Sequence, residues 1–194
     1  VLRVPLVIWL VFWAPHWVLL AAVASIGVVC FREYSGLVAG HGIPPPGPVG
    51  YAAGILLLVV PQKDILAVVL LAILALGLGL QQSDLAKSLP RAAALALGVL
   101  YVFGGWWAAV ALHEFHPHWL MLGLVLNWVG DTSAYLAGKA VGRHRLAPAV
   151  SPKKTWEGAA GSLAAALACG YVYARFLIPG APPHQVLLLA AAVN

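Results

Sequence analysis

Charged residues are scarce in this chain. Asp, Glu, Lys and Arg make up 9% of its 194 residues, whereas hydrophobic residues make up 62%. Because ordinary soluble domains carry roughly 25% charged residues, so few charges could not cover a water-soluble fold of this size. The abundance of apolar side chains equally excludes a disordered chain. The composition therefore predicts an integral membrane protein that crosses the bilayer several times.

Cysteine and methionine are scarce as well. Cys30 and Cys169, the two cysteines, lie in apolar stretches, which excludes a disulfide framework and is typical of small buried side chains. The single methionine is Met121, and the apolar run 186–193 stops at the end of the chain. We therefore expect Val1 not to be a translation start and the chain to be a fragment of a longer protein.

Long apolar runs predict membrane-spanning helices. A bilayer core about 30 Å thick requires about 20 apolar helical residues, and backbone polar groups in lipid must bond within their own segment. We predict an all-α, polytopic integral membrane protein with about seven to eight transmembrane helices, forming a single membrane domain over residues 1–194. The expected apolar segments are Val4–Val29 (one kinked helix or a hairpin), Val49–Val60, Ile65–Leu80, Ala92–Leu112, Trp119–Gly138, Thr155–Ile178 and a last one from Val186 onward.

The connecting segments indicate the orientation in the membrane. We expect a turn over Pro61–Asp64 and loops over Phe31–Pro48, Gln81–Arg91 and Lys139–Lys154. If the spans alternate between two sides, most of the 11 Lys and Arg residues fall on the side of the Lys139–Lys154 loop. Cytoplasmic loops are enriched in Lys and Arg, so we expect this basic loop to be cytoplasmic in a bacterial-type inner (cell) membrane. Nucleic-acid binding is a poor explanation of the net charge of +5, because there is no soluble basic face.

A polar stripe carries the first chemical signal. Asp131 lies about eight residues, or roughly 12 Å, from the cytoplasmic end of its predicted span. A carboxylate at such a depth costs about 2.5 kcal/mol or more and usually faces a cavity or a partner. Every fourth residue around it is polar, so that one helix face carries Asn127, Asp131, Tyr135 and Lys139. We interpret the stripe as functional, and a hydrogen-bond clamp between two helices is the alternative.

A stripe of small residues lies beside the polar one. It comprises Gly130, Ala134, Gly138 and Gly142, and the next span repeats the spacing with Gly158, Ser162, Ala166 and Gly170. Small residues at this spacing let membrane helices approach backbone to backbone. We therefore predict that these two helices, within residues 119–178, pack closely and hold the basic loop directly above Asp131.

The end of the basic loop predicts the start of a helix, with Ser151 at the N-cap and Pro152 at the first helical position. The first turn would then contain Lys153, Lys154 and Thr155. Lysine is unfavourable at the positive end of the helix dipole unless an anion such as phosphate binds there. The alternative is an ordinary cap in a loop whose positive charge only orients the protein.

Glu157 and Asp131 complete this hypothesis. Glu157 would pair with Lys153 four residues earlier, or orient Lys154. Mg²⁺ is typically held by one or two carboxylates together with substrate phosphates. An anion site beside a carboxylate is therefore the combination that phosphoryl or nucleotidyl transfer requires.

Two sequence elements carry a family resemblance. They are Gly130-Asp131-Thr132-Ser133-Ala134-Tyr135 and Ser151-Pro152-Lys153-Lys154-Thr155-Trp156-Glu157-Gly158. At these residues the chain resembles the phosphatidate cytidylyltransferases, or CDP-diacylglycerol synthases. That family's later signature, a Lys-Asp pair and a Gly-His-Gly-Gly stretch, does not occur in the residues that follow Gly158. We expect a C-terminal truncation to account for this difference.

The resemblance implies an integral membrane enzyme of phospholipid biosynthesis that acts as a homodimer. It would transfer a cytidylyl group from CTP to phosphatidic acid, giving CDP-diacylglycerol and pyrophosphate, with Mg²⁺ or another divalent cation. Asp131 would hold the metal and, with Lys154, would be catalytic. The resemblance and the polar stripe together give the substrate-binding candidates Ser151, Lys153, Thr155, Glu157, Tyr135 and Asn127.

Two other functions remain open from the sequence. A CTP-dependent polyprenol or phytol kinase would share the phosphate site and use an alcohol acceptor. A secondary transporter would use Asp131 as its ion site, although such proteins often show inverted repeats and broken helices that we do not find here.

Overall fold

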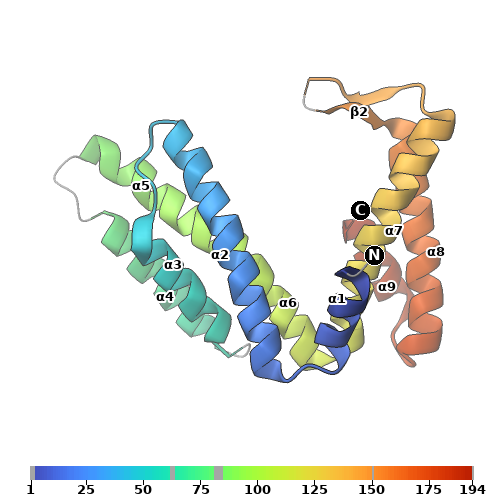
Figure 1. Ribbon diagram of the computed structural model, residues 1–194, viewed down its shortest axis with the longest axis horizontal. Coiled ribbons are helices and arrows are strands. Elements are labelled where there is room, and N and C mark those ends of the chain that lie inside the picture. Colours follow the sequence, from blue (N-terminus) through green and yellow to red (C-terminus); the bar gives the residue numbers. More distant parts are fainter. Residues whose placement is uncertain (1–2, 62–63, 81–84, 150, 194) are drawn as a thin grey trace. The chain divides into compact units, whose positions relative to one another are not determined.

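The computed structural model describes residues 3–61, 64–80, 85–149 and 151–193. The chain folds into two compact units, Val1–Phe115 and His116–Asn194 (Figure 1). Both are built from helices, which confirms the all-α prediction apart from two short strands in the second unit. That the two units together form a single membrane domain stays a prediction.

The first unit packs its helices around two phenylalanines. Its elements are α1 (Arg3–Phe12), α2 (His16–Gly40), α3 (Gly47–Val59), α4 (Ile65–Gly79), α5 (Leu85–Gly98), the π-helical segment η1 (Val99–Phe103) and α6 (Gly104–Phe115). Phe31 and Phe103 are both fully buried, and their ring centroids lie 5.4 Å apart. The ring of Tyr51 packs edge-on against Phe31 at 4.9 Å, so α2, α3 and η1 share one core.

In this unit the structure decides one open alternative and corrects two predicted boundaries. Of the two alternatives for Val4–Val29, the structure agrees with the hairpin, because the chain breaks at Pro15 between α1 and α2. The loop predicted over Phe31–Pro48 is wrong as far as Gly40, because Phe31 is a core residue and α2 continues through it. Residues 85–91 are helical in α5, whereas residues 62–63 and 81–84 of the predicted turn and loop lie outside the described residues.

The second unit is a helix pair with a strand hairpin at one end. It consists of α7 (Pro117–Val141), β1 (Arg145–Ala147), β2 (Ser151–Thr155), α8 (Trp156–Leu177) and α9 (Pro183–Val193). The strands pair antiparallel, with Arg145 opposite Thr155 and Ala147 opposite Ser151. Figure 1 shows α7 and α8 running side by side below this hairpin. The prediction for residues 139–154 was a basic loop that ends in a helix start at Ser151, so the hairpin is a correction.

Helices α7 and α8 meet along their small residues, as the spacing predicted. The buried residues of α8 are Gly158, Ser162, Ala166, Gly170 and Ala174. The hydroxyl of Ser162 donates a hydrogen bond to the backbone carbonyl of Gly130 across the interface at 2.9 Å. A Cβ atom on Gly158 would lie 2.9 Å from the carbonyl oxygen of Ala134. The backbones therefore approach so closely that a larger side chain would separate the helices.

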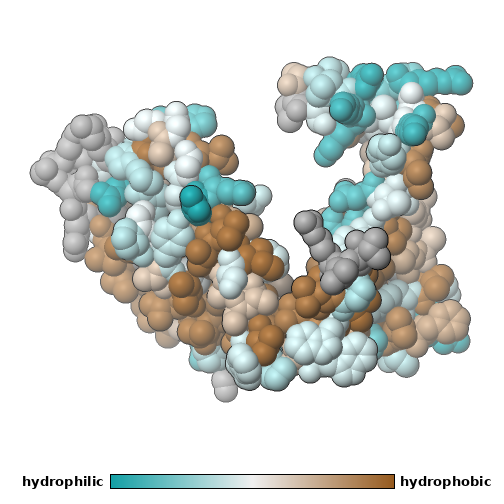
Figure 2. All heavy atoms as spheres, viewed as in Figure 1, coloured by the Kyte–Doolittle hydropathy of each residue, from teal (hydrophilic) through white to brown (hydrophobic). Residues whose placement is uncertain are grey.

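The apolar surface of the helices suits contact with the lipids of a bilayer. Among the residues that the structure describes, three helical stretches are long and apolar enough to cross a membrane, namely His16–Gly40, Ser88–Phe115 and Trp156–Leu177. Large apolar side chains stay exposed on both units, including Leu66 and Phe176. Figure 2 shows hydrophobic residues over the helices and hydrophilic residues on the hairpin of the second unit. Because soluble proteins rarely expose apolar patches of this extent, the chain is an integral membrane protein.

The helix contact predicts the effect of adding one methyl group. A Cβ atom on Gly161 would lie 2.6 Å from the Cβ of Ala137 in α7, and this Cβ cannot swing away because it is bonded directly to the helix backbone. We expect Gly161→Ala to destabilise the protein by about 1–3 kcal/mol, the usual cost of overpacking. Thermal unfolding in detergent measures this cost. Gly123→Ala is the matched control, because its new Cβ in α7 meets no atom within 4 Å, and equal loss in both variants would contradict the packing.

Candidate functional site

A cavity of about 570 Å³ lies in the second unit, where α7, the hairpin and the start of α8 meet. This volume is within the range of small-molecule sites. The described residues that line it are Asn127, Gly130, Asp131, Ala134, Tyr135, Gly138, Lys139, Arg145, Leu146, Lys153, Lys154, Thr155, Gly158, Ala159, Ser162 and Val193.

The polar stripe of α7 faces this cavity. All four of its members, Asn127, Asp131, Tyr135 and Lys139, are lining residues. The ammonium of Lys139 lies 6.0 Å from the centroid of the Tyr135 ring, so the lysine folds back along the helix toward the tyrosine. The structure thus brings Asp131 into the same cavity as Lys153 and Lys154, which lie more than 20 residues further along the chain.

The charges around the cavity are strongly unequal. Asp131 is the one carboxylate among the described lining residues, and the cations are Lys139, Arg145, Lys153 and Lys154. Within the described part of the chain, the Asp131 carboxylate makes no hydrogen bond or ion pair. A cavity with this balance attracts anions, and Asp131 stays available to a cation that enters with them.

Helix α8 begins later than the sequence predicted. Its N-cap is Thr155, whose hydroxyl oxygen accepts a hydrogen bond from the backbone N–H of Gly158 at 3.1 Å. Ser151 and Pro152 lie instead in β2, because pairing with β1 draws residues 151–155 into a strand. The prediction of Ser151 as the N-cap is therefore wrong, and Ser151 does not belong to the described cavity lining.

This correction changes how the lysines are presented. Lys153 and Lys154 are exposed residues of the hairpin, not members of the first helical turn. They reach the cavity from the strand, while Thr155 and Gly158 line it at the N-terminus of α8. The positive end of that helix and the two ammonium groups therefore act on the same space.

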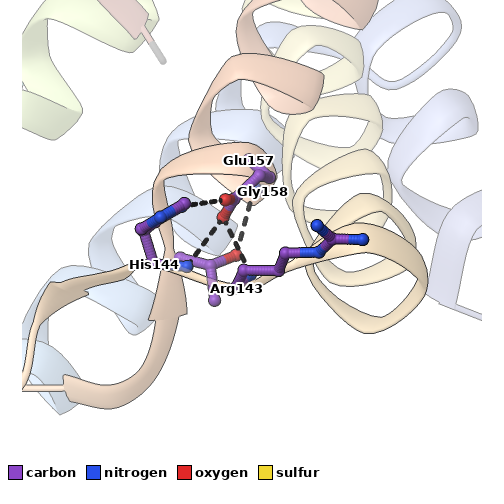
Figure 3. A network of polar contacts seen from close by, with 5 residues as sticks. Arg143, His144, Glu157 and Gly158 are labelled. Atoms are coloured by element: carbon purple, nitrogen blue, oxygen red, sulfur yellow. Dashed lines mark hydrogen bonds and ion pairs between the residues drawn. The ribbon is translucent and has the colours of Figure 1, made fainter.

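Glu157 fastens the hairpin to α8 instead of pairing with the lysines. One carboxylate oxygen accepts a hydrogen bond from the His144 ring at 2.6 Å, and the other accepts the backbone N–H groups of Arg143 at 3.1 Å and His144 at 3.3 Å (Figure 3). The backbone N–H of Trp156 also donates to the His144 carbonyl at 3.0 Å. The predicted partnership of Glu157 with Lys153 or Lys154 is wrong, because an i,i+4 contact requires a helix where β2 lies.

Two parts of the site escaped the sequence interpretation. Arg145 lines the cavity from β1, and its guanidinium donates to the backbone carbonyl of Pro152 across the hairpin. His144 fixes the end of the hairpin through Glu157. Both belong to the basic stretch between the two helices, which was predicted as a loop, so its charge was the only available signal.

Gly138 of α7 and Gly142, the C-cap of that helix, leave room for Thr155, the N-cap of α8. A Cβ atom on Gly138 would lie 3.1 Å from the Thr155 hydroxyl oxygen, and one on Gly142 would lie 2.9 Å from it. The small-residue stripe therefore continues beyond the helix pair and lets the capping threonine approach α7. Gly138 and Thr155 both line the cavity at this approach.

Comparison with known proteins gives a consistent result. A family model described as the cytidylyltransferase family matches residues 1–194. Phosphatidate cytidylyltransferase of Haemophilus influenzae is 41% identical over 63 residues, which cover 32% of this chain and 22% of that protein. The protein of the same name from Pseudomonas aeruginosa is 42% identical over 72 residues, 36% of this chain and 27% of the relative.

A longer match covers more of the chain at lower identity. Phosphatidate cytidylyltransferase of Staphylococcus aureus is 28% identical over 145 residues, which cover 71% of this chain and 55% of that protein. The chain therefore spans about half the length, or less, of these curated relatives.

The Glu157 contacts predict how the hairpin responds to loss of one charge. We expect Glu157→Gln to loosen the hairpin, because an amide cannot accept from the His144 ring and two backbone N–H groups as strongly as a carboxylate does. Trypsin should then cleave after Lys153 and Lys154 several-fold faster, since proteolysis follows the population of the open form. Peptide mapping by mass spectrometry measures the rate.

A matched variant separates this effect from general loss of charge. Glu33→Gln removes an exposed carboxylate from α2 in the first unit. It should leave cleavage in the hairpin unchanged. Equal cleavage rates in the Glu157→Gln variant and the parent protein would contradict the fastening role of Glu157.

Proposed function

The chain belongs to the cytidylyltransferase family, and on this premise we propose that it carries the phosphate-binding part of a phosphatidate cytidylyltransferase. The reaction transfers the cytidylyl group of CTP to phosphatidic acid and releases pyrophosphate. One observation carries the proposal, namely the meeting of a free carboxylate with four cations in one cavity of about 570 Å³. The family's substrates are highly charged phosphates, which such a cavity would bind.

The reaction requires the protein mainly to position the phosphates and to neutralise their negative charge. An oxygen of the lipid phosphate forms a bond to the α-phosphorus of CTP, while the bond from that phosphorus to the bridging oxygen of the β-phosphate breaks. Negative charge then develops on pyrophosphate. Lys153 and Lys154 would offset this charge from the hairpin side, next to the N-terminus of α8.

The residues present fit a divalent cation. Asp131 offers a carboxylate that no described residue engages, and Asn127 offers an amide oxygen one helical turn away in the same cavity. Among the described residues no cluster of three His, Cys, Asp or Glu could hold a metal by itself. Mg²⁺ suits this arrangement, because it binds through one or two carboxylates together with substrate phosphates. When bound, it would supply charge neutralisation on the triphosphate.

The membrane arrangement is part of the proposal. Besides the three long helices, Gly47–Val59 and Pro183–Val193 are short apolar helices, and α7 has 25 residues. We propose that the protein crosses the bilayer about seven to eight times, and these six elements would supply most of the crossings. We place the hairpin on the cytoplasmic side of a bacterial inner membrane, because its Arg and Lys residues follow the positive-inside rule. A homodimer is the proposed assembly.

Substitution in the cavity tests the proposal. We expect Asp131→Asn and Lys154→Ala each to lower cytidylyl transfer by about 10²-fold or more, the usual cost of removing a group that stabilises transition-state charge. The assay incubates radiolabelled CTP, phosphatidic acid and Mg²⁺ with the protein expressed from its complete gene. Arg175→Ala is the control, because Arg175 lies in the last turn of α8 and outside the described cavity lining.

The same assay distinguishes the other functions. Transfer of only the γ-phosphate to a long-chain alcohol would favour a CTP-dependent kinase. Proton flux in liposomes without any transfer would favour a transporter with Asp131 as its ion site. Full cytidylyl transfer by both the Asp131→Asn and the Lys154→Ala variants would contradict the proposed site.

A further inference from the structure

The cavity holds more positive charge than one nucleotide requires. Its four cations exceed its single carboxylate by three charges. A nucleoside triphosphate with one bound Mg²⁺ carries about two negative charges. A phosphate monoester adds about −1.5 to −2 at neutral pH. The cavity therefore has the charge for two phosphate-bearing ligands bound together, which is what the proposed reaction needs.

The four cations come from two different parts of the unit. Arg145, Lys153 and Lys154 belong to the hairpin, whereas Lys139 belongs to the last turn of α7. Lys139 lies two helical turns beyond Asp131, about 12 Å along the axis. Among the described lining residues, Lys139 is therefore the cation that belongs to α7. It lies near the C-terminal end of that helix.

The position of Lys139 suits a lipid phosphate. Acyl chains hold the phosphate of a lipid at the membrane interface, while a nucleotide arrives from water. The Lys139 ammonium folds back toward the Tyr135 ring at 6.0 Å, and both side chains line the cavity. Lysine and tyrosine at the ends of membrane helices typically lie at the headgroup level. The hairpin cations line the same cavity from β1 and β2 and would remain for the nucleotide.

We propose that Lys139 binds the phosphate monoester of the acceptor lipid and thereby selects a phosphorylated lipid over a lipid alcohol. This inference rests on the proposed function and adds a specificity-determining residue to it. An alcohol acceptor would leave the Lys139 ammonium in the cavity without an anionic partner, which disfavours that acceptor.

Kinetics with two varied substrates test the assignment. For Lys139→Ala we expect the KM for phosphatidic acid to rise about tenfold or more, the loss typical of one charged hydrogen bond. The KM for CTP should stay within about twofold, and Lys139→Arg should restore most of the affinity for phosphatidic acid, because it keeps the charge. Inorganic phosphate should compete with phosphatidic acid in the parent protein and lose this effect in Lys139→Ala.

Arg143→Ala is the matched control. It removes a positive charge four residues further on, from a side chain outside the described cavity lining. Its KM for phosphatidic acid should equal that of the parent protein. An equal rise in Arg143→Ala would overturn the proposal, because it would reflect general attraction of anionic lipid.

The outcomes separate this inference from the proposed function. If the parent protein transfers cytidylyl groups and Lys139→Ala raises the KM for CTP instead, the inference fails and the proposed function stands. If the parent protein transfers none, both fail. If Lys139→Ala is inactive, equilibrium binding of labelled CTP decides: retained binding supports a role toward the lipid, and lost binding overturns it.

Discussion

The close approach of α7 and α8 determines the geometry of the site. Gly158 faces the Ala134 carbonyl, and the Ser162 hydroxyl bonds to the Gly130 carbonyl across the contact. In lipid such contacts depend on close packing, because neighbouring helices gain little from hydrophobic burial. The close contact brings the N-terminus of α8 beside the C-terminal turns of α7. The chain between the two helices can then form only a short hairpin, and its cations meet the face of α7 that carries Asp131.

Spacing in the sequence predicted this contact well. Residues at every fourth position share a helix face, and the buried residues of α8 follow that rule from Gly158 to Gly170. The same rule placed Asn127, Asp131, Tyr135 and Lys139 together, and all four line the cavity. These predictions succeeded because they depend on helix geometry alone. No distant segment had to be known in order to make them.

The errors arose where distant pairing overrode a local signal. Ser151-Pro152 and Thr155 are both acceptable helix starts by sequence, and pairing of residues 145–147 with 151–155 decides for Thr155. Strands of three and five residues carry too little alternation to be recognised. Because Lys153 lies in a strand, it does not share a helix face with Glu157. The Glu157 carboxylate accepts hydrogen bonds from the ring and the backbone N–H of His144 instead. Phe31 was assigned to a loop because polar residues follow it, whereas its ring completes the core of the first unit.

The central claim is that one cavity in the second unit receives the nucleotide. Its cations and its free carboxylate are the groups that the proposed function assigns to a triphosphate. Photolabelling with azido-CTP in the presence of Mg²⁺, followed by peptide mapping, tests the claim most directly. The account predicts label on residues 127–139 and 151–159 that excess CTP removes. Label confined to residues 3–115, or label that CTP does not displace, would contradict it.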